Sequence, residues 1–171
     1  LSSDALDNEN KYGLEKMSTI KNSENDIRII GVINNKREYR YVDKEYSGIK
    51  LDSTLDKYKV FLSKAISSGI NDTILRPFIG LPNDICTETY LVIGSFDNKE
   101  QAENCISYIN TKFFHACLLS KVTSQNISKS AFDLIPVQDF NERWTDEKLY
   151  AKYNFSDDDI MYIEASIRDI K

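Results

Sequence analysis

Continuous and alternating apolar stretches predict the strands of this chain. Apolar, mostly β-branched residues occupy 27–33, and after a short polar turn the residues 38–42 alternate between polar and apolar side chains. This pattern is typical of a β-hairpin, with a tight turn at 34–37. Apolar, β-branched or aromatic runs of strand length recur further along the chain and predict additional strands at 58–62, 73–79, 89–94 and 132–138.

A helical period follows the strand at 89–94. Asp97 and Glu100 have the spacing of a helix N-cap and its capping-box acid. The apolar residues that follow recur every three or four positions, at Ala102, Cys105, Ile106, Ile109, Phe113 and Cys117. One apolar stripe of this length predicts a single long amphipathic helix over 98–120.

Two short helices are predicted at the C-terminal end. Thr145, followed by two acidic residues, is typical of a helix start, and this helix runs to about Tyr153. Ser156 and the three aspartates after it predict the cap of a last helix. The apolar face of that helix comprises Ile160, Ile163, Ile167 and Ile170.

These elements predict an α+β fold: a small, mainly antiparallel, curved sheet packed against one long helix, with the two short C-terminal helices outside. The chain has 171 residues, 41% of them hydrophobic and 29% charged, which fits one soluble domain with a single core. Residues 1–24 are polar and predict a linker or frayed N-terminal segment, so the domain covers 25–171. The first residue is Leu1, from which we expect a piece of a longer protein.

Composition also bears on location and on metal binding. No apolar run approaches the roughly 20 residues that a membrane-spanning helix needs. The three cysteines are odd in number and lack a Cys-x-x-Cys spacing, and two of them fall on the apolar helical stripe. We therefore expect reduced thiols, a cytoplasmic protein and no metal site.

The net charge of −5 is unevenly distributed. Residues 1–26 contain six acids and three bases, and residues 139–171 contain nine acids and five bases. The middle, 27–138, contains fourteen bases and twelve acids, and its stretch 104–132 has three lysines and no acid. The acidic ends therefore leave a central region that can face phosphate groups.

No catalytic constellation stands out. The six glycines fit neither the GxGxxG nor the GxxxxGK(S/T) spacing of nucleotide-binding loops. The single histidine, His115, lies in an apolar helical stretch, where we expect a structural role. Asp84 and Glu88 are close in sequence but lack the Glu-x-Lys of a metal-dependent nuclease, and the aspartates at 157–159 are explained by helix capping. The three prolines are isolated from one another, so the sequence contains no catalytic motif with a Pro-Pro dipeptide. The sequence indicates binding rather than a reaction, with no catalytic residue.

The polar stretch 121–130 is the main candidate for binding. Lys121, Lys129 and nearby hydroxyls suit phosphates, while Gln125 and Asn126 carry the paired donor and acceptor that fit an adenine edge in the major groove. An ordinary solvated loop is the alternative. The basic hairpin at 27–42 has a similar alternative, since charges on an edge strand also discourage aggregation.

Six stretches, in this order and spacing, resemble the C-terminal specificity region of single-chain, adenine-specific DNA methyltransferases from bacterial restriction–modification systems. They are DKYKVFLSK at 56–64, CTETYLVIGSF at 86–96, EQAENCISYINTKFF at 100–114, IPVQDF at 135–140, WTDEKLYAKY at 144–153 and DIMYIEASI at 159–167. The resemblance covers about 27–170. It implies a target-recognition domain for double-stranded DNA, with no cofactor of its own, whose upstream methyltransferase domain binds S-adenosylmethionine and flips out the adenine.

The resemblance also implies where DNA is contacted. The expected residues come from the hairpin, from the loop after the strand at 58–62 and from the polar stretch: Lys36, Arg37, Lys64, Ser67, Lys121, Thr123, Gln125, Asn126 and Lys129. We expect them to line one DNA-facing surface. Two alternatives stay open: a nuclease-bearing fragment of a restriction enzyme, and a structural or subunit-docking module that uses its tail helices.

Overall fold

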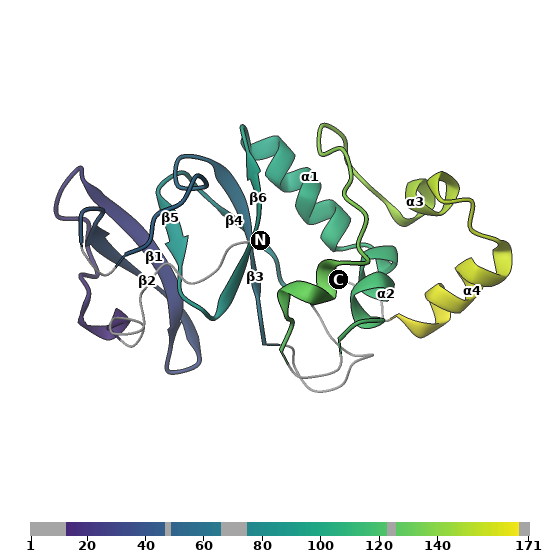
Figure 1. Ribbon diagram of the computed structural model, residues 1–171, viewed down its shortest axis with the longest axis horizontal. Coiled ribbons are helices and arrows are strands. Elements are labelled where there is room, and N and C mark those ends of the chain that lie inside the picture. The colour runs from purple at the N-terminus through teal and green to yellow at the C-terminus, as the bar shows by residue number, and fades with distance from the viewer. Residues whose placement is uncertain (1–12, 47–48, 66–74, 123–125, 168–171) are drawn as a thin grey trace. The chain divides into compact units, whose positions relative to one another are not determined.

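The computed structural model (Figure 1) describes residues 13–46, 49–65, 75–122 and 126–167. The chain divides into two compact units, each described by itself below. Unit 1 comprises Leu1–Ser63 and Phe78–Lys99, and unit 2 comprises Lys64–Pro77 and Glu100–Lys171. The sequence predicted one domain over 25–171, whereas the contacts of the structure group its residues into two.

Unit 1 contains the strands. They are β1 (Asp26–Ile33), β2 (Lys36–Asp43), β3 (Tyr58–Ser63), β4 (Phe78–Gly80), β5 (Asp84–Cys86) and β6 (Tyr90–Phe96). The described strands form two three-stranded sheets, in the orders β2-β1-β5 and β4-β3-β6. Every pairing is antiparallel except that of β1 with β5. One curved sheet was predicted, and two small sheets are present.

The hairpin predicted at the start of this unit is confirmed. β1 and β2 pair antiparallel from Asp26–Asp43 to Ile33–Lys36, which leaves two residues in the turn. These residues, Asn34 and Asn35, have φ angles of 50° and 61°. Two successive positive φ values define a type I′ turn, whose twist matches that of the two strands. Asparagine is the non-glycine residue that best tolerates such φ values. The turn is therefore encoded locally.

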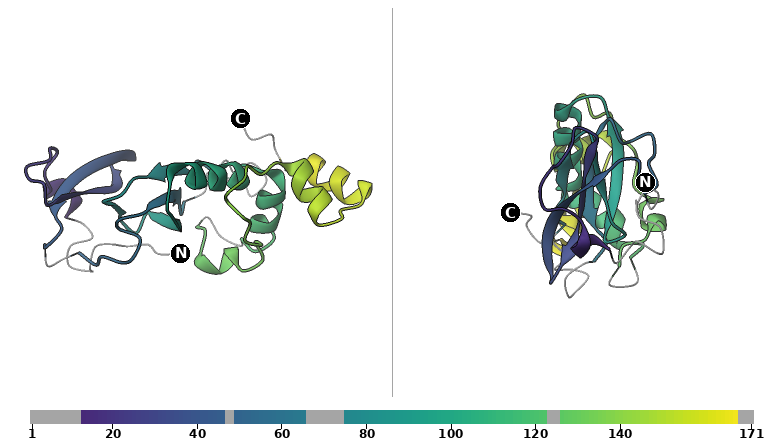
Figure 2. Two further views of the ribbon diagram at one scale, coloured as in Figure 1. Left: turned by 90° about the horizontal axis from the view of Figure 1, so that it is seen from above. Right: turned by 90° about the vertical axis from the view of Figure 1, so that its left-hand side faces the viewer.

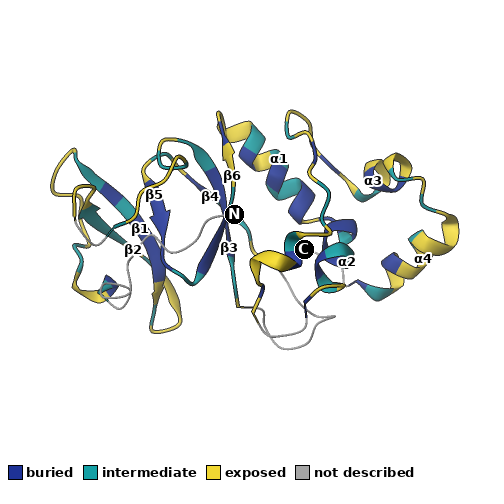
Figure 3. Ribbon diagram, viewed as in Figure 1, coloured by how far each residue is buried: buried dark blue, intermediate teal, exposed yellow. Residues whose placement is uncertain are grey.

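The apolar residues of β1 face two different clusters. Ile27 and Ile29 pack with Leu14 and Ile85, while Ile30 packs with Phe61 of β3 and with residues of β6. The buried residues of β1 and β3 appear dark blue in Figure 3. A strand buried on both faces is mostly apolar in sequence, and Arg28 is the only charged residue of 27–33.

Residues 13–18 pack onto the first of these clusters. Leu14, in the 3-10 helix η1 (Leu14–Lys16), is 5% exposed, and Ser18 forms a β-bridge with Tyr41 of β2. Residues 1–24 were predicted to be a linker or a frayed segment. Residues 13–18 are instead packed against β1 and β2, because one leucine there covers the open face of the sheet.

A buried ionic cluster joins the two sheets of unit 1. The Asp84 carboxylate of β5 accepts hydrogen bonds from Arg28 Nε (2.8 Å), Arg28 Nη2 (2.6 Å) and the Leu81 amide (2.7 Å). Lys59 of β3 is 1% exposed, and its Nζ donates to the carbonyls of Asp84 (3.0 Å) and Leu55 (3.2 Å). Burial lowers the pKa of Lys59 to about 8, and the negative charge of Asp84 partly opposes that shift.

Strand β6 confirms the prediction at 89–94 and contains a bulge. Tyr58 pairs with Phe96 and Val60 with Ile93, so β6 has one extra residue at this point. Gly94, within the bulge, has a φ of 79°. Because a Cβ atom disfavours this conformation, glycine is the residue expected there. Of the strand predicted at 73–79, the described residues show only β4, which begins after Pro77.

Unit 2 is helical. Its elements are α1 (Lys99–Ile109), α2 (Lys112–Leu119), the 3-10 helix η3 (Lys129–Phe132), α3 (Asp146–Lys152) and α4 (Asp157–Ser166). α2 contacts η3, α3 and α4, and α3 lies beside α4 in the views of Figures 1 and 2. The two short C-terminal helices are confirmed, as is the α+β fold class. Among the described helices, none combines the length and apolar character that crossing a bilayer requires.

The single long helix predicted over 98–120 is wrong, since it breaks between α1 and α2. Thr111 caps α2 by accepting a hydrogen bond from the Phe114 amide (3.1 Å), and its hydroxyl donates to the Tyr108 carbonyl (2.7 Å). The Asp146 carboxylate accepts from the amides of Lys112 (3.0 Å) and Phe113 (2.8 Å). Together these groups satisfy three amides that otherwise lack partners at a helix start.

The strand predicted at 132–138 is also wrong. After η3 the chain has no regular structure until α3, and side chains hold it in place. The Pro136 carbonyl accepts from Tyr108 Oη (2.8 Å), and the buried Gln138 side chain donates to Tyr153 Oη (2.8 Å) and accepts from Lys152 Nζ (2.7 Å). Pro136 has no amide to give to a sheet, so strand composition alone misled here.

Candidate nucleic-acid interface

Two of the predicted binding segments lie side by side in unit 2. Ala65 forms an antiparallel β-bridge with Asn126, and the Ile127 amide donates to the Lys64 carbonyl at 2.8 Å. The loop after β3 and the polar stretch 121–130, about sixty positions apart, therefore share a short stretch of backbone pairing. Three predicted residues, Ser67, Thr123 and Gln125, lie outside the described residues.

The polar stretch is anchored by its apolar residues. Val122, Ile127 and Ala131 are 6%, 1% and 2% exposed, and η3 contacts α2. The predicted contact residues on the same segment, Lys121, Asn126 and Lys129, are exposed, and Lys64 is half-buried. Buried residues between exposed ones fix which side chains point to solvent. The described residues of this segment thus present Lys121 and Lys129 to solvent beside the buried Val122, Ile127 and Ala131.

The charges of this segment are available to an external anion. Within the described part of the chain, no ion pair involves Lys64, Lys121 or Lys129, whereas Lys112 and Lys148 of the same unit pair with Glu164 and Glu142. The hydroxyls of Ser128 and Ser130, on either side of Lys129, lie 2.8 Å apart and share one hydrogen bond. Three uncompensated cations and hydroxyl groups are the side chains that hold phosphate oxygens.

The other predicted residues, Lys36 and Arg37, lie in unit 1 at the start of β2, just after the turn. Both are exposed, but the Arg37 guanidinium lies 3.6 Å from the centroid of the Phe78 ring. This stacking gives Arg37 a packing role within unit 1. Lys36 and Arg37 belong to unit 1 and the other described candidates to unit 2, so the single DNA-facing surface expected from the sequence stays a prediction.

His115 is a buried residue of α2, as predicted. It is 2% exposed, and its Nε2 has no hydrogen-bond partner among the described residues. Burial lowers the pKa of His115 to about 4, and a hydrogen bond with the Ile109 backbone partly opposes this shift. An imidazole held neutral by an apolar environment suits a structural role better than proton transfer.

The lowered pKa of His115 predicts an acid sensitivity. The unfolded chain takes up this proton near pH 6.5 and the folded chain only near pH 4, so stability falls as the pH drops through that interval. We expect the free energy of unfolding of the unaltered chain to fall by about 2 kcal/mol between pH 6.5 and 4 through this residue, and we expect His115→Leu to abolish that fall. Urea unfolding of both proteins across this range measures it, and parallel curves of stability against pH would contradict it.

Two of the acidic residues considered for nuclease chemistry, Asp84 and Asp159, have structural partners, whereas Glu88 Oε2 is buried without a hydrogen-bond partner among the described residues. Asp84 is occupied by Arg28 and the Leu81 amide, and Asp159 forms a capping box with Ser156 at the start of α4. Among the described residues, no group of three or more His, Cys, Asp or Glu side chains is placed to hold a metal ion. The three cysteines form no disulfide there, and burial raises the pKa of the Cys105 thiol to about 12.

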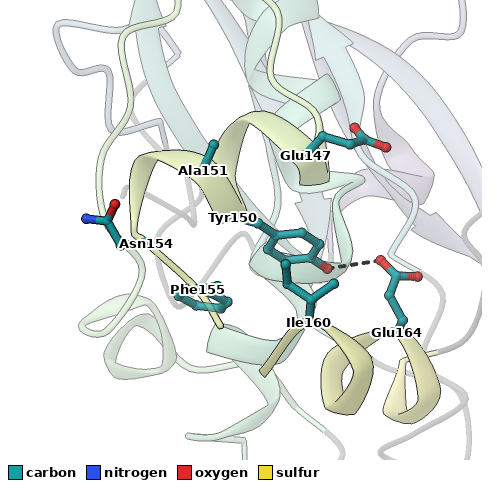
Figure 4. A pocket seen from close by; sticks show the side chains of 7 residues that line it. All are labelled: Glu147, Tyr150, Ala151, Asn154, Phe155, Ile160 and Glu164. Carbon is teal, nitrogen blue, oxygen red and sulfur yellow. Dashed lines mark hydrogen bonds between the residues drawn. The ribbon is translucent and has the colours of Figure 1, made fainter. Parts of the chain in front are cut away.

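Sequence reasoning missed a cavity of about 600 Å³ within unit 2. It is lined by residues of α3, α4 and the turn between them: Glu147, Tyr150, Ala151, Asn154, Phe155, Ile160 and Glu164 (Figure 4). A signal was present, since Glu147, Tyr150, Ala151 and Asn154 recur at helical spacing. Only the packing of α3 against α4, however, turns that row into a concave site.

No protein-family model, curated protein or solved structure matches this chain.

Proposed function

We propose that this chain is a non-catalytic domain that recognises a sequence in double-stranded DNA. One observation carries the proposal: the pairing of Ala65 with Asn126, which brings the loop after β3 beside the anchored segment with Lys121 and Lys129. Two segments that are distant in sequence thereby place their lysines in the same unit. This arrangement favours the target-recognition domain, which the resemblance implied, over an ordinary solvated loop.

In this proposal the lysines and the amides have different roles. Lys64, Lys121 and Lys129 neutralise phosphates, which supplies affinity without reading sequence. The side chain of Asn126, and that of Gln125 as predicted from the sequence, read base edges. Ser67 and Thr123 add hydroxyl contacts to the backbone, and Lys36 contributes from the hairpin of unit 1. The acidic tail of 139–171, with its net charge of −4, lies outside the contact.

The methyl transfer belongs to a partner domain. We propose an upstream, adenine-specific methyltransferase domain, which binds S-adenosylmethionine and acts on the adenine once it is flipped out of the duplex. The present chain then positions that duplex. Such an enzyme acts on DNA in the cytoplasm of a bacterial cell.

Phosphate binding is tested by removing two exposed lysines at once. We expect Lys121→Ala/Lys129→Ala to weaken binding of the 171-residue chain to any duplex about tenfold, because two phosphate contacts are lost. The slope of log K against log salt should fall by about two. Fluorescence anisotropy with a labelled duplex at four salt concentrations measures both quantities.

Lys148→Ala is the matched control, since Lys148 is an exposed lysine of the same unit that is already paired with Glu142. It should leave affinity and slope unchanged. Equal losses of DNA affinity in the double variant and in the control would show that net charge alone explains the effect, and would overturn the assignment of these lysines. Absence of duplex binding by the unaltered chain at low salt would overturn the proposed function itself.

Sequence reading has a separate readout. Selection of bound duplexes from a random library should yield a common motif for the unaltered chain. We expect Asn126→Ala to lose discrimination at one position of that motif, by about ten- to a hundredfold, while its affinity for unrelated duplex changes little. A motif that is unchanged in Asn126→Ala would remove this residue from the base-reading set.

A further inference from the structure

The pocket between α3 and α4, here called the α3–α4 cavity, lies in the acidic part of unit 2 and is distant in sequence from the lysine-bearing segment 121–130. Its lining comes entirely from residues 147–164. α3 ends at Lys152, and the chain reverses at Asn154, whose φ is 52°, before Ser156 caps α4. The two helices and the turn thus form three sides of the cavity, as Figure 4 shows.

The walls of the cavity are aromatic and aliphatic. The rings of Tyr150 and Phe155 stack, with centroids 5.7 Å apart and planes 20° from parallel. Ile160 of α4 and Ala151 of α3 complete the apolar lining. Flat aromatic faces of this kind bind apolar groups, and they also attract cations through the negative face of the ring.

The charged groups of the lining are two glutamates, and one of them is held by hydrogen bonds. Glu164 Oε1 accepts a hydrogen bond from Tyr150 Oη (3.1 Å), and Glu164 Oε2 is 2.7 Å from Lys112 Nζ. Glu147 is an exposed second carboxylate of the lining. Burial raises the pKa of the Tyr150 phenol, and the nearby charges of Asp146, Glu164 and Glu147 raise it further, as a local negative potential does.

We infer that this cavity docks a protein segment through an arginine side chain flanked by apolar residues. A guanidinium stacks on aromatic faces and pairs with carboxylates, and so complements both the walls and the rim. The pocket is open to solvent, and its volume of about 600 Å³ exceeds what one side chain fills, which leaves room for the residues that flank the arginine.

The test uses short peptides and NMR of the whole 171-residue chain. The probe is acetyl-Leu-Arg-Leu-amide, and its controls are the same peptide with citrulline in place of arginine, which is neutral and of the same shape, and free arginine amide. We expect the arginine peptide to shift the resonances of Tyr150, Phe155 and Ile160 at millimolar concentration. It should bind about tenfold more tightly than the citrulline peptide, because the charged contact is lost there.

Protein variants locate the contact. Glu147→Gln keeps the shape of an exposed side chain and should lower the affinity for the arginine peptide about three- to tenfold. Asp158→Asn changes an exposed acid of α4 outside the lining and should leave this affinity unchanged. Equal binding of the arginine and citrulline peptides would overturn the charge assignment. Free arginine amide binding as tightly as the peptide would show a small-molecule cation site and overturn the docking of a protein segment.

This inference is independent of the proposed function. Its readouts contain no DNA, and the variants leave Lys121, Asn126 and Lys129 untouched. Failure of DNA binding therefore leaves the α3–α4 cavity as evidence for the docking module considered from the sequence. Failure of the peptide experiment leaves the lysine-bearing segment unaffected.

Discussion

Replacing Asp84 with alanine is expected to lower the free energy of unfolding by about 4 kcal/mol. The Asp84 side chain is almost fully enclosed, and its carboxylate accepts from Arg28 and from the Leu81 amide. The truncation leaves Arg28 without its counter-charge and Lys59 without the acid that opposes its desolvation. Removing one partner of a buried ionic group costs far more than the intact pair contributes, because the remaining charge stays out of water.

Urea unfolding at pH 7 measures this effect. Glu24→Ala is the matched control, because Glu24 also pairs with a lysine of unit 1, Lys21 at 3.6 Å, but that pair lies at the surface. Surface pairs contribute little, so the control should unfold like the unaltered chain. If Asp84→Ala fails to fold, Asp84→Asn keeps an acceptor for Arg28 and should give a smaller, measurable loss. Equal stability of the Asp84 and Glu24 variants would contradict the ionic cluster.

The second large effect is expected for Asp146→Ala, at about 3 kcal/mol. Asp146 is the first residue of α3, yet its carboxylate caps α2 by accepting from the amides of Lys112 and Phe113. Both amides would lose their partner in a half-buried place, and α2 would lose a negative charge at its positive end. Burial raises the pKa of Asp146, which limits the net gain from the carboxylate.

The location of this loss can be measured residue by residue. Hydrogen exchange should show α2 opening more often in Asp146→Ala, while β1 and β3 of unit 1 keep their protection. Asp158→Ala, a change of one exposed acid in α4, should have little effect on either. Unchanged exchange of Phe113 and Phe114 in Asp146→Ala would show that Thr111 alone suffices as the cap of α2.

The lysine-bearing segment illustrates how far sequence reasoning reached for the candidate site. Charge counting found Lys121 and Lys129, because an acid-free stretch in an acidic chain is visible without a structure, and the resemblance added Lys64. It could not show that Lys64 lies beside Ile127, since their backbone hydrogen bond joins residues far apart in the chain. Sequence reasoning offered two roles for Arg37, DNA contact and a charge on an edge strand, whereas the structure stacks Arg37 on Phe78. The α3–α4 cavity needed both helices in place.

The sequence by itself determined the features that depend on near neighbours. The Asn34–Asn35 turn, the caps at Thr145 and Ser156, and the apolar run of β1 are set within a few residues, and they carry the α+β class. Only the tertiary structure decided the end of α1, because the Asp146 carboxylate that caps α2 comes from 34 positions away. The parallel pairing of β1 with β5 and the irregular course of 132–138 were decided in the same way. The backbone groups in these regions form hydrogen bonds with residues that are distant in sequence, so a local sequence pattern cannot predict them.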